Sequence, residues 1–207
     1  YTFQKQLDEA CEKYGLKTMS VGHDPITDIK DVPNNPKKRY DVMTEEMPKS
    51  GELSLEMMYQ TCGTQINLDY TSESDFKKKF KIISFLTPLT IALFSNSPIK
   101  KNTPTGLLSY RSKVWQSTSR GGLPDIFLED MDFEKYADFS LNFNLLFLFE
   151  NNRYNSANGK NFQDLINEQK ANSENFQLHL STIFTELRLK KYIELRSIDA
   201  CEWDCHC

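Results

Sequence analysis

The sequence predicts an α/β fold of the α+β type, and three observations lead to that expectation. Apolar residues recur at helical spacing in some segments, polar and apolar residues alternate with a period of two in others, and no long linker divides the 207 residues. A chain of this length can bury one sizeable core. We therefore expect a single domain over residues 1–207, built from helices and strands.

The first quarter of the chain predicts two helices separated by a long connection. Phe3, Leu7, Cys11 and Tyr14 share one helical face, and Gly15 supplies a stop. Three prolines indicate that the connection is a loop. In order, the expected elements are a helix over 3–14, a strand over 16–22, a loop over 23–38 and a helix over 40–47.

A strand with an unusual polar face is predicted over residues 60–70. Gln65, Asn67 and Asp69 alternate with apolar residues, so all three lie on one face of the strand. Amides and a carboxylate are more typical of ligand binding than of a surface kept soluble by Lys and Glu. Asp69 could equally cap the helix that follows.

That following helix has a start signal and a possible interruption. Ser72 and Asp75 stand at capping-box spacing, although Asp is a weaker partner than Glu or Gln. Phe76, Phe80 and Ile83, with Ile82 beside them, form the apolar stripe. Pro88 is expected to kink or restart the helix before residues 91–94.

The remaining half predicts short elements. Asn151-Asn152 joins two strand-like runs, a pattern typical of a hairpin. In the last strand Tyr192, Glu194 and Arg196 share one face. The expected order is a loop over 95–105, the segment 107–115 with Arg111 and Trp115, a turn at 121–122, a helix over 133–141, strands over 145–150 and 153–156, helices over 162–167 and 176–183, and a strand over 191–199.

Composition excludes several classes of protein. The net charge of −4 does not favour nucleic acid, and the run Lys77–Lys79 is typical of a solvated helix face. No apolar run reaches the length of a membrane span. Five cysteines without even spacing do not indicate a disulfide framework, so we expect a reducing cytoplasm.

Common catalytic motifs are missing from the sequence. Its three histidines form no visible triad, and no nucleophile-elbow serine accompanies them. Neither a P-loop nor a dinucleotide fingerprint is present. Hydrolase chemistry therefore has little support.

Several segments, in this order and spacing, resemble the plant and proteobacterial type of glutamate–cysteine ligase (γ-glutamylcysteine synthetase). The resemblance runs over essentially the whole chain, which looks like an internal fragment. Any one motif could arise by chance, whereas the series together is a strong match. The segments are Arg39-Tyr40-Asp41-Val42-Met43, Met47-Pro48-Lys49-Ser50-Gly51, Met57-Met58-Tyr59-Gln60-Thr61-Cys62, Gln65-Ile66-Asn67-Leu68-Asp69-Tyr70, Ala92-Leu93-Phe94-Ser95-Asn96-Ser97-Pro98, Gly106-Leu107-Leu108-Ser109-Tyr110-Arg111-Ser112-Lys113-Val114-Trp115, His179-Leu180-Ser181-Thr182-Ile183-Phe184 and Tyr192-Ile193-Glu194-Leu195-Arg196-Ser197-Ile198-Asp199.

The resemblance implies a fold and a reaction. The fold would be glutamine-synthetase-like, a curved and mostly antiparallel sheet with helices packed outside. The reaction would use ATP and Mg²⁺ to join the γ-carboxylate of glutamate to cysteine through γ-glutamyl phosphate, the first step of glutathione synthesis. Such chemistry requires hard oxygen ligands for Mg²⁺ and cationic donors for the phosphates. The partners would be these small molecules, and the oligomeric state stays open.

The resemblance also implies roles for the two polar strands. Glu194 resembles a metal-binding carboxylate, and Arg196 would contact the transferring phosphoryl group. Gln65 would serve both metal and phosphate, and Asn67 the nucleotide phosphates. Without the resemblance, Glu194 and Arg196 would be interpreted as an ordinary cross-strand ion pair.

Four further residues are expected to bind substrates. Arg111, taken with Arg196 as catalytic, would hold the α-carboxylate of glutamate, because a guanidinium fork suits that planar group. Trp115 would wall the same pocket, although a surface Arg stacked on a core Trp is the structural alternative. Tyr59 and Thr61 would line the cysteine pocket.

The chain departs from the family's pattern in three places. The upstream acidic residues that would hold most of the Mg²⁺ are missing, so this fragment alone is expected to be inactive. No cysteine occurs between Gly63 and Ala200, unlike the redox pair of plant members, which favours a bacterial enzyme. The tail gathers Cys201, Cys205, His206 and Cys207, for which metal binding is conceivable but not favoured. Alternatives are another carboxylate–amine ligase of this fold, or a non-catalytic amino-acid or nucleotide-binding module.

Overall fold

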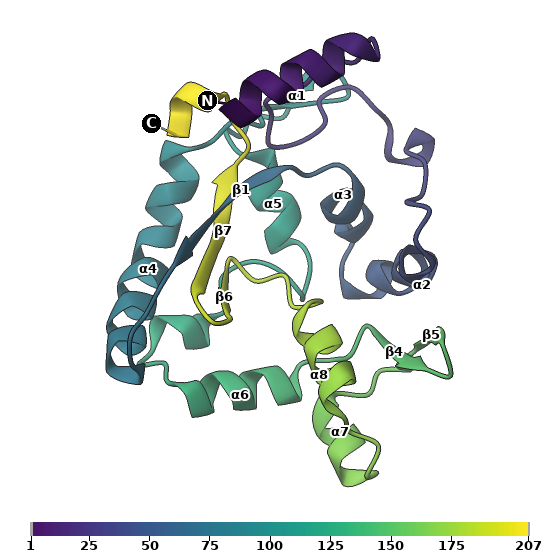
Figure 1. Cartoon of the computed structure of the whole chain (residues 1–207), viewed down its shortest axis with the longest axis vertical. Helices are drawn as coiled ribbons and strands as arrows, with labels where there is room; N and C mark the ends of the chain where they lie inside the picture. Colours follow the sequence, from purple (N-terminus) through teal and green to yellow (C-terminus); the bar gives the residue numbers. More distant parts are fainter. Residues whose placement is uncertain (1, 207) are drawn as a thin grey trace.

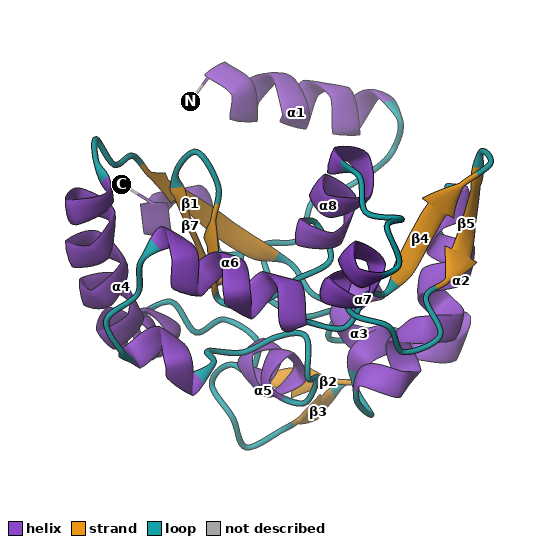
Figure 2. Ribbon diagram, turned by 90° about the horizontal axis from the view of Figure 1, so that it is seen from below, coloured by secondary structure: helices purple, strands orange, loops and turns teal. Residues whose placement is uncertain are grey.

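The computed structural model describes residues 2–206, apart from the side chains of Asp204 and His206. Eight α-helices and seven strands mix along this part of the chain, which confirms the α+β prediction (Figures 1 and 2). The helices are α1 (Thr2–Lys13), α2 (Lys38–Glu46), α3 (Ser54–Tyr59), α4 (Glu73–Leu93), α5 (Tyr110–Gln116), α6 (Phe133–Asn142), α7 (Phe162–Asn167) and α8 (Ser173–Leu180). The strands are β1 (Gly63–Leu68), β2 (Ile99–Lys100), β3 (Thr103–Pro104), β4 (Phe147–Glu150), β5 (Arg153–Ser156), β6 (Leu187–Leu189) and β7 (Ile193–Asp199).

The main sheet has three antiparallel strands in the order β1-β7-β6. Its central strand β7 is buried at all seven positions, although the sequence predicted a strand with one polar face. Ile193 and Leu195 pack into the core, whereas Glu194 and Arg196 are buried polar groups. The polar face of β7 therefore lies inside the protein, where each charged group needs a partner.

The largest hydrophobic cluster lies between this sheet and α4, which Figure 1 shows along one side of β1 and β7. Phe76 and Phe80 are fully buried and contact each other's rings, as the helical spacing predicted, while Ile83 packs at the margin. Ile82 is exposed. Ser72 caps α4 by accepting a hydrogen bond from Asp75 N, which settles the alternative of Asp69 as the cap.

The predicted restart at Pro88 is wrong, because α4 runs without interruption from Glu73 to Leu93. Contacts on both sides of the proline hold the helix in place. Phe80 packs in the core before it, and Thr90 Oγ1 lies 2.7 Å from Ser197 Oγ of β7 after it. These tertiary contacts outweigh the one backbone hydrogen bond that proline removes.

Two hairpins are built on residues with positive φ. Asn151 and Asn152 have φ of 52° and 64° between β4 and β5, as the Asn-Asn pair predicted. Lys101 and Asn102 join β2 and β3 with φ of 48° and 58°. This second hairpin lies in a segment for which a loop was predicted, because two-residue strands leave no readable alternation.

Two other predictions in the first third are corrected. Residues 16–22 form no strand, since most of them are exposed and no ladder partner faces them. The strand predicted over 60–70 covers only Gly63–Leu68, because α3 occupies Ser54–Tyr59 and Gln60 is its C-cap. Helix α8 begins three residues earlier than predicted, where the side chain of Asn172 caps it.

Candidate functional site

A cavity of about 200 Å³ lies where helices α3 and α5 meet the main sheet. Figure 1 shows the two strands concerned, β1 and β7, side by side. Five of the residues predicted for the site line the cavity, namely Thr61, Gln65, Arg111, Trp115 and Arg196. The remaining lining residues are Arg39, Tyr40, Met43, Met57, Met58, Gly63 and Phe184.

Helix α5 places Arg111 and Trp115 on the same face. Ser109 caps the start of the helix, because its hydroxyl accepts a hydrogen bond from Ser112 N at 3.1 Å. Residues four apart lie above one another on a helix, so the guanidinium reaches the indole. Arg111 Cζ stands 4.5 Å from the Trp115 ring centroid.

Strand β7 brings a second guanidinium to the same indole. Arg196 Cζ is 4.9 Å from the Trp115 ring and 6.0 Å from that of Phe184. Both arginines are almost fully buried, with exposed fractions of 2% for Arg111 and 8% for Arg196. A cation near an aromatic face is stabilised more when the charge is desolvated, and both guanidinium groups are buried.

The two guanidinium groups are incompletely satisfied. Arg111 Nη2 donates to the carbonyl of Arg196 at 2.7 Å. Within the described part of the chain, Nε and Nη1 of both residues have no hydrogen-bond acceptor. Each Nη1 does stand at ion-pair distance from a carboxylate, 3.7 Å from Asp199 Oδ1 for Arg111 and 3.8 Å from Glu194 Oε2 for Arg196, but beyond hydrogen-bonding range. Buried donors without hydrogen-bond acceptors are costly, so these four nitrogen atoms favour an acceptor supplied from outside the chain.

Burial also shapes the charge of the pair. Burial, aided by the positive charge of Arg188, lowers the pKa of Arg196 to about 10, while Glu194 opposes the shift. Burial lowers the pKa of Arg111 as well, and Glu186 and Asp199 oppose it. With a pKa of about 10, Arg196 remains protonated at neutral pH, and an anion placed between the two guanidinium groups would offset the cost of burying positive charge.

Two acidic residues accompany the arginines, and the sequence analysis assigned neither of them a role. Asp199 Oδ1 lies 3.7 Å from Arg111 Nη1 and is held by Ser97 and Ser109 through their hydroxyls. Glu186 is 1% exposed and makes no side-chain hydrogen bond among the described residues. Burial raises the pKa of Glu186, although the charges of Arg111 and Arg196 act in the opposite direction.

Strand β1 approaches this cluster closely because it begins with glycine. A Cβ at Gly63 would stand 2.7 Å from Arg111 Nη2 and 2.9 Å from the Ile198 carbonyl oxygen. The register with β7 then shifts between Thr64 and Ile66, which brings Gln65 to the cavity. Thr61 accepts a hydrogen bond from Trp115 Nε1 at 3.3 Å and so fixes the indole.

Three predicted site residues do not line the cavity. Glu194 pairs with Arg188 Nε at 2.5 Å and Lys190 Nζ at 2.7 Å, and Asn67 stands opposite it on β1. Burial acts to raise the pKa of Glu194, but the hydrogen bonds from Arg188 and Lys190 bring it below its usual value.

Tyr59, the third of these residues, points away from the cavity. Its hydroxyl contacts Asn34 and lies 2.5 Å from Thr44 Oγ1.

The described residues do not fit a complete Mg²⁺ site. Both carboxylate oxygens of Glu194 accept from cationic side chains. No group of three His, Cys, Asp or Glu residues gathers to hold a metal ion anywhere in residues 2–206 for which side chains are described. This also bears on the cysteine-rich tail, of which Cys207 and the side chain of His206 lie outside the described residues.

Sequence reasoning missed Arg39, Glu186 and Asp199. Arg39 and Asp199 stand at the ends of segments that carry the family resemblance, which was the available signal. Glu186 follows a loop and precedes a three-residue strand, so no periodicity marked it as buried.

A sequence model of "Glutamate-cysteine ligase family 2 (GCS2)" matches residues 2–207. The chain is 36% identical to glutamate–cysteine ligase A, chloroplastic, of Oryza sativa subsp. japonica, and 37% identical to the chloroplastic glutamate–cysteine ligases of Nicotiana tabacum and Medicago truncatula. Each match covers 96% of this chain and 42%, 40% and 41% of the relative, respectively. The chain thus spans about two fifths of the length of these curated relatives.

The names of these relatives place them in plants and in the chloroplast, so they give no support to the expected bacterial source or cytoplasmic location. No helix in the described part of the chain has the length and apolar character needed to cross a membrane. The match over nearly the whole chain shows its family: this chain belongs to glutamate–cysteine ligase family 2.

Proposed function

We propose that the protein containing this chain joins the γ-carboxylate of glutamate to the amine of cysteine, with ATP converted to ADP and phosphate. Family membership supports the proposal. The observation that carries it within the chain is a pair of buried guanidinium groups, those of Arg111 and Arg196, beside the indole of Trp115. The Nε and Nη1 atoms of both groups have no hydrogen-bond acceptor among the described residues. Two cations with free donors in one small cavity suit the carboxylate and phosphoryl groups of this reaction.

The proposed roles follow from placement. Arg111 holds the α-carboxylate of glutamate against Trp115, and Arg196 stabilises charge on the transferring phosphoryl group. Gln65 and Thr61 complete the cavity wall toward the substrates. Asn67 and Tyr59 do not line this cavity. Their proposed contacts, Asn67 with the nucleotide and Tyr59 with cysteine, would therefore be made outside it.

Magnesium and ATP are proposed as the cofactor and the second substrate. Mg²⁺ would shield the phosphate charge, and Glu194 and Gln65 are the oxygen donors that this chain offers. Since the carboxylate oxygens of Glu194 already pair with Arg188 and Lys190, we expect the other Mg²⁺ ligands to come from elsewhere in the protein. On this proposal the chain is one partial catalytic domain that is inactive alone. The four described cysteines form no disulfide with one another, which is compatible with a reducing compartment such as the cytoplasm.

The test is ADP release by the full-length protein with glutamate, cysteine and Mg-ATP. We expect release that requires both amino acids and falls at least 100-fold in Arg196→Ala, because a charge contact to the reacting group is lost. Arg153→Ala, on the exposed strand β5, is the matched control and should keep wild-type activity. Release with other amines but not cysteine would indicate another ligase, and binding without any ADP release would indicate a non-catalytic module.

A further inference from the structure

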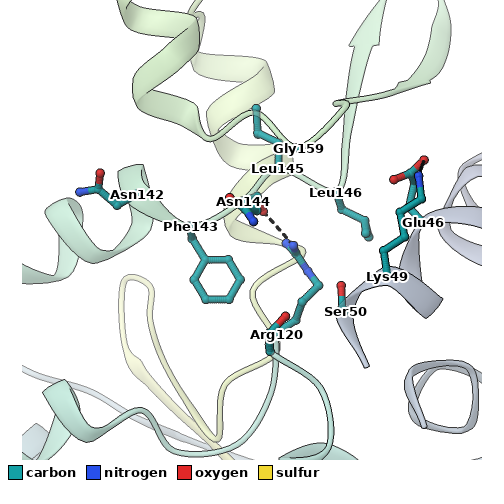
Figure 3. A pocket seen from close by; sticks show the side chains of 11 residues that line it. Glu46, Lys49, Ser50, Arg120, Asn142, Phe143, Asn144, Leu145, Leu146 and Gly159 are labelled. Carbon is teal, nitrogen blue, oxygen red and sulfur yellow. Dashed lines mark hydrogen bonds and ion pairs between the residues drawn. The ribbon is translucent and has the colours of Figure 1, made fainter. Parts of the chain in front are cut away.

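A second pocket lies away from the cavity just described, and Figure 3 shows it from close by. It has a volume of about 310 Å³ and is formed by the end of α2, the 3-10 turn η2 (Met47–Ser50), the loop after α5 and the segment that leads from α6 to β4. Arg120 from the loop after α5 extends into the centre of this view.

Arg120 is buried without a counter-ion. Its side chain donates from Nε and Nη2 to the carbonyl and hydroxyl of Thr182, each at 3.0 Å, and from Nη1 to the Asn144 carbonyl at 2.8 Å. The residue is 3% exposed, and no described carboxylate lies within ion-pair distance of it. All three acceptors are neutral, and a guanidinium has five N–H donors, so two remain.

The other charges of the pocket do not compensate this cation. Lys49 Nζ and Glu46 Oε1 form their own pair at 2.8 Å, which leaves Arg120 as the unbalanced charge. Burial alone lowers the pKa of Arg120 to about 10, so the group stays protonated at neutral pH. The centroid of the Phe143 ring lies 5.1 Å from Arg120 Cζ, and both residues line the pocket.

We propose that this pocket binds a small oxygen anion, a carboxylate or a phosphate, with Arg120 as its principal ligand. A buried charge without a partner is costly, and an anion that accepts the two remaining N–H groups would offset that cost. Ser50 lies beside Arg120 in the pocket and can supply a hydroxyl donor. The site does not depend on the proposed ligase activity.

The pocket is linked to the first cavity through one backbone contact. The Arg120 carbonyl accepts a hydrogen bond from Phe184 N at 2.8 Å, and Phe184 lines the cavity that holds Arg196. An anion at Arg120 would therefore bind four residues after the end of α5 and one backbone hydrogen bond away from a residue that lines the first cavity. An anion bound in the pocket would therefore act on the loop after α5, which contacts both sites.

The experiment measures thermal unfolding of the full-length protein in inorganic phosphate and in succinate, against sodium chloride at equal ionic strength. We expect a saturable rise in Tm of about 2–4 °C with at least one anion, as ligand linkage requires. A response to phosphate alone or to succinate alone identifies the class of anion. No rise with either anion would overturn the proposal.

Three variants locate the response. Ser50→Asp places a carboxylate beside Arg120, so it should raise Tm without added anion and remove the response. Asn155→Asp adds the same charge on exposed β5 and should keep the response. Arg196→Ala should also keep it, which separates this pocket from the first cavity. A response that survives in Ser50→Asp but disappears in Arg196→Ala would contradict the assignment.

Discussion

Protonation of His179 provides a quantitative test of the structure. This residue of α8 is 2% exposed, and its Nε2 lies 2.7 Å from the Ser140 carbonyl, so Nε2 carries a proton and donates. Its ring stacks on Phe162, and Nδ1 has no partner among the described residues. Burial lowers the pKa of His179 to about 4, and the charge of Arg120 adds to the effect.

The sign and size of the pH effect follow from linkage. An unfolded histidine titrates near pH 6.5, so between about pH 6.5 and 4 the unfolded chain binds a proton that the folded chain does not. Stability is therefore complete above about pH 6.5 and falls as the pH falls. With a folded pKa of about 4, this group removes about 2 kcal/mol of unfolding free energy between pH 7.5 and 5, and ~3 kcal/mol by pH 4.

Urea unfolding of the wild type and His179→Gln at pH 7.5 and pH 5 measures this quantity. Glutamine keeps an N–H donor for Ser140 but does not titrate, so its loss of stability should be about 2 kcal/mol smaller than that of the wild type. Gln177→Ala, on the exposed side of α8, should retain the wild-type pH dependence. Equal pH dependence in wild type and His179→Gln would refute the buried neutral histidine.

Three further predictions concern the core and the cavity. Phe80→Ala should cost about 3–5 kcal/mol in urea unfolding, because its fully buried ring contacts Phe76 and Phe127, whereas exposed Lys78→Ala should change stability by less than ~0.5 kcal/mol. Trp115→Leu should lower kcat/KM for glutamate at least about 10-fold in the ADP-release assay, because two cation–π contacts are lost, and half-exposed Trp203→Leu should leave it unchanged. Gly63→Ala should raise the KM for glutamate, because the new Cβ displaces the Arg111 guanidinium, and an unchanged KM would show that Arg111 does not hold this substrate.

The sequence predicted the elements with strong local signals. The Asn-Asn hairpin and the apolar spacing of Phe76 and Phe80 are properties of a few neighbouring residues, and the structure confirms both. The interruption at Pro88 was wrong because the contacts of Thr90 with β7 come from residues more than 100 positions away. Strand β6 has only three residues, too few for a readable alternation.

Prediction of the site depended on the same distinction. Helical spacing places Arg111 beside Trp115, and the family resemblance grouped Arg196 with them; all three line one cavity, while their roles stay a prediction. The burial of both faces of β7 could not be predicted from its alternation, because its polar positions Glu194 and Arg196 are buried as well as its apolar ones. The pairing of Glu194 with Arg188 and Lys190 depends on a tight β6–β7 connection that the sequence did not reveal.

The most direct test of the proposed ligation follows an oxygen atom. In a reaction through γ-glutamyl phosphate, a γ-carboxylate oxygen attacks the terminal phosphorus and ADP leaves. The cysteine amine then attacks the acyl carbon, and phosphate departs with that oxygen. Full-length protein supplied with glutamate labelled with ¹⁸O in the γ-carboxylate should therefore release phosphate that carries one ¹⁸O atom, in step with γ-glutamylcysteine. Dipeptide formed with unlabelled phosphate would contradict the acyl-phosphate route.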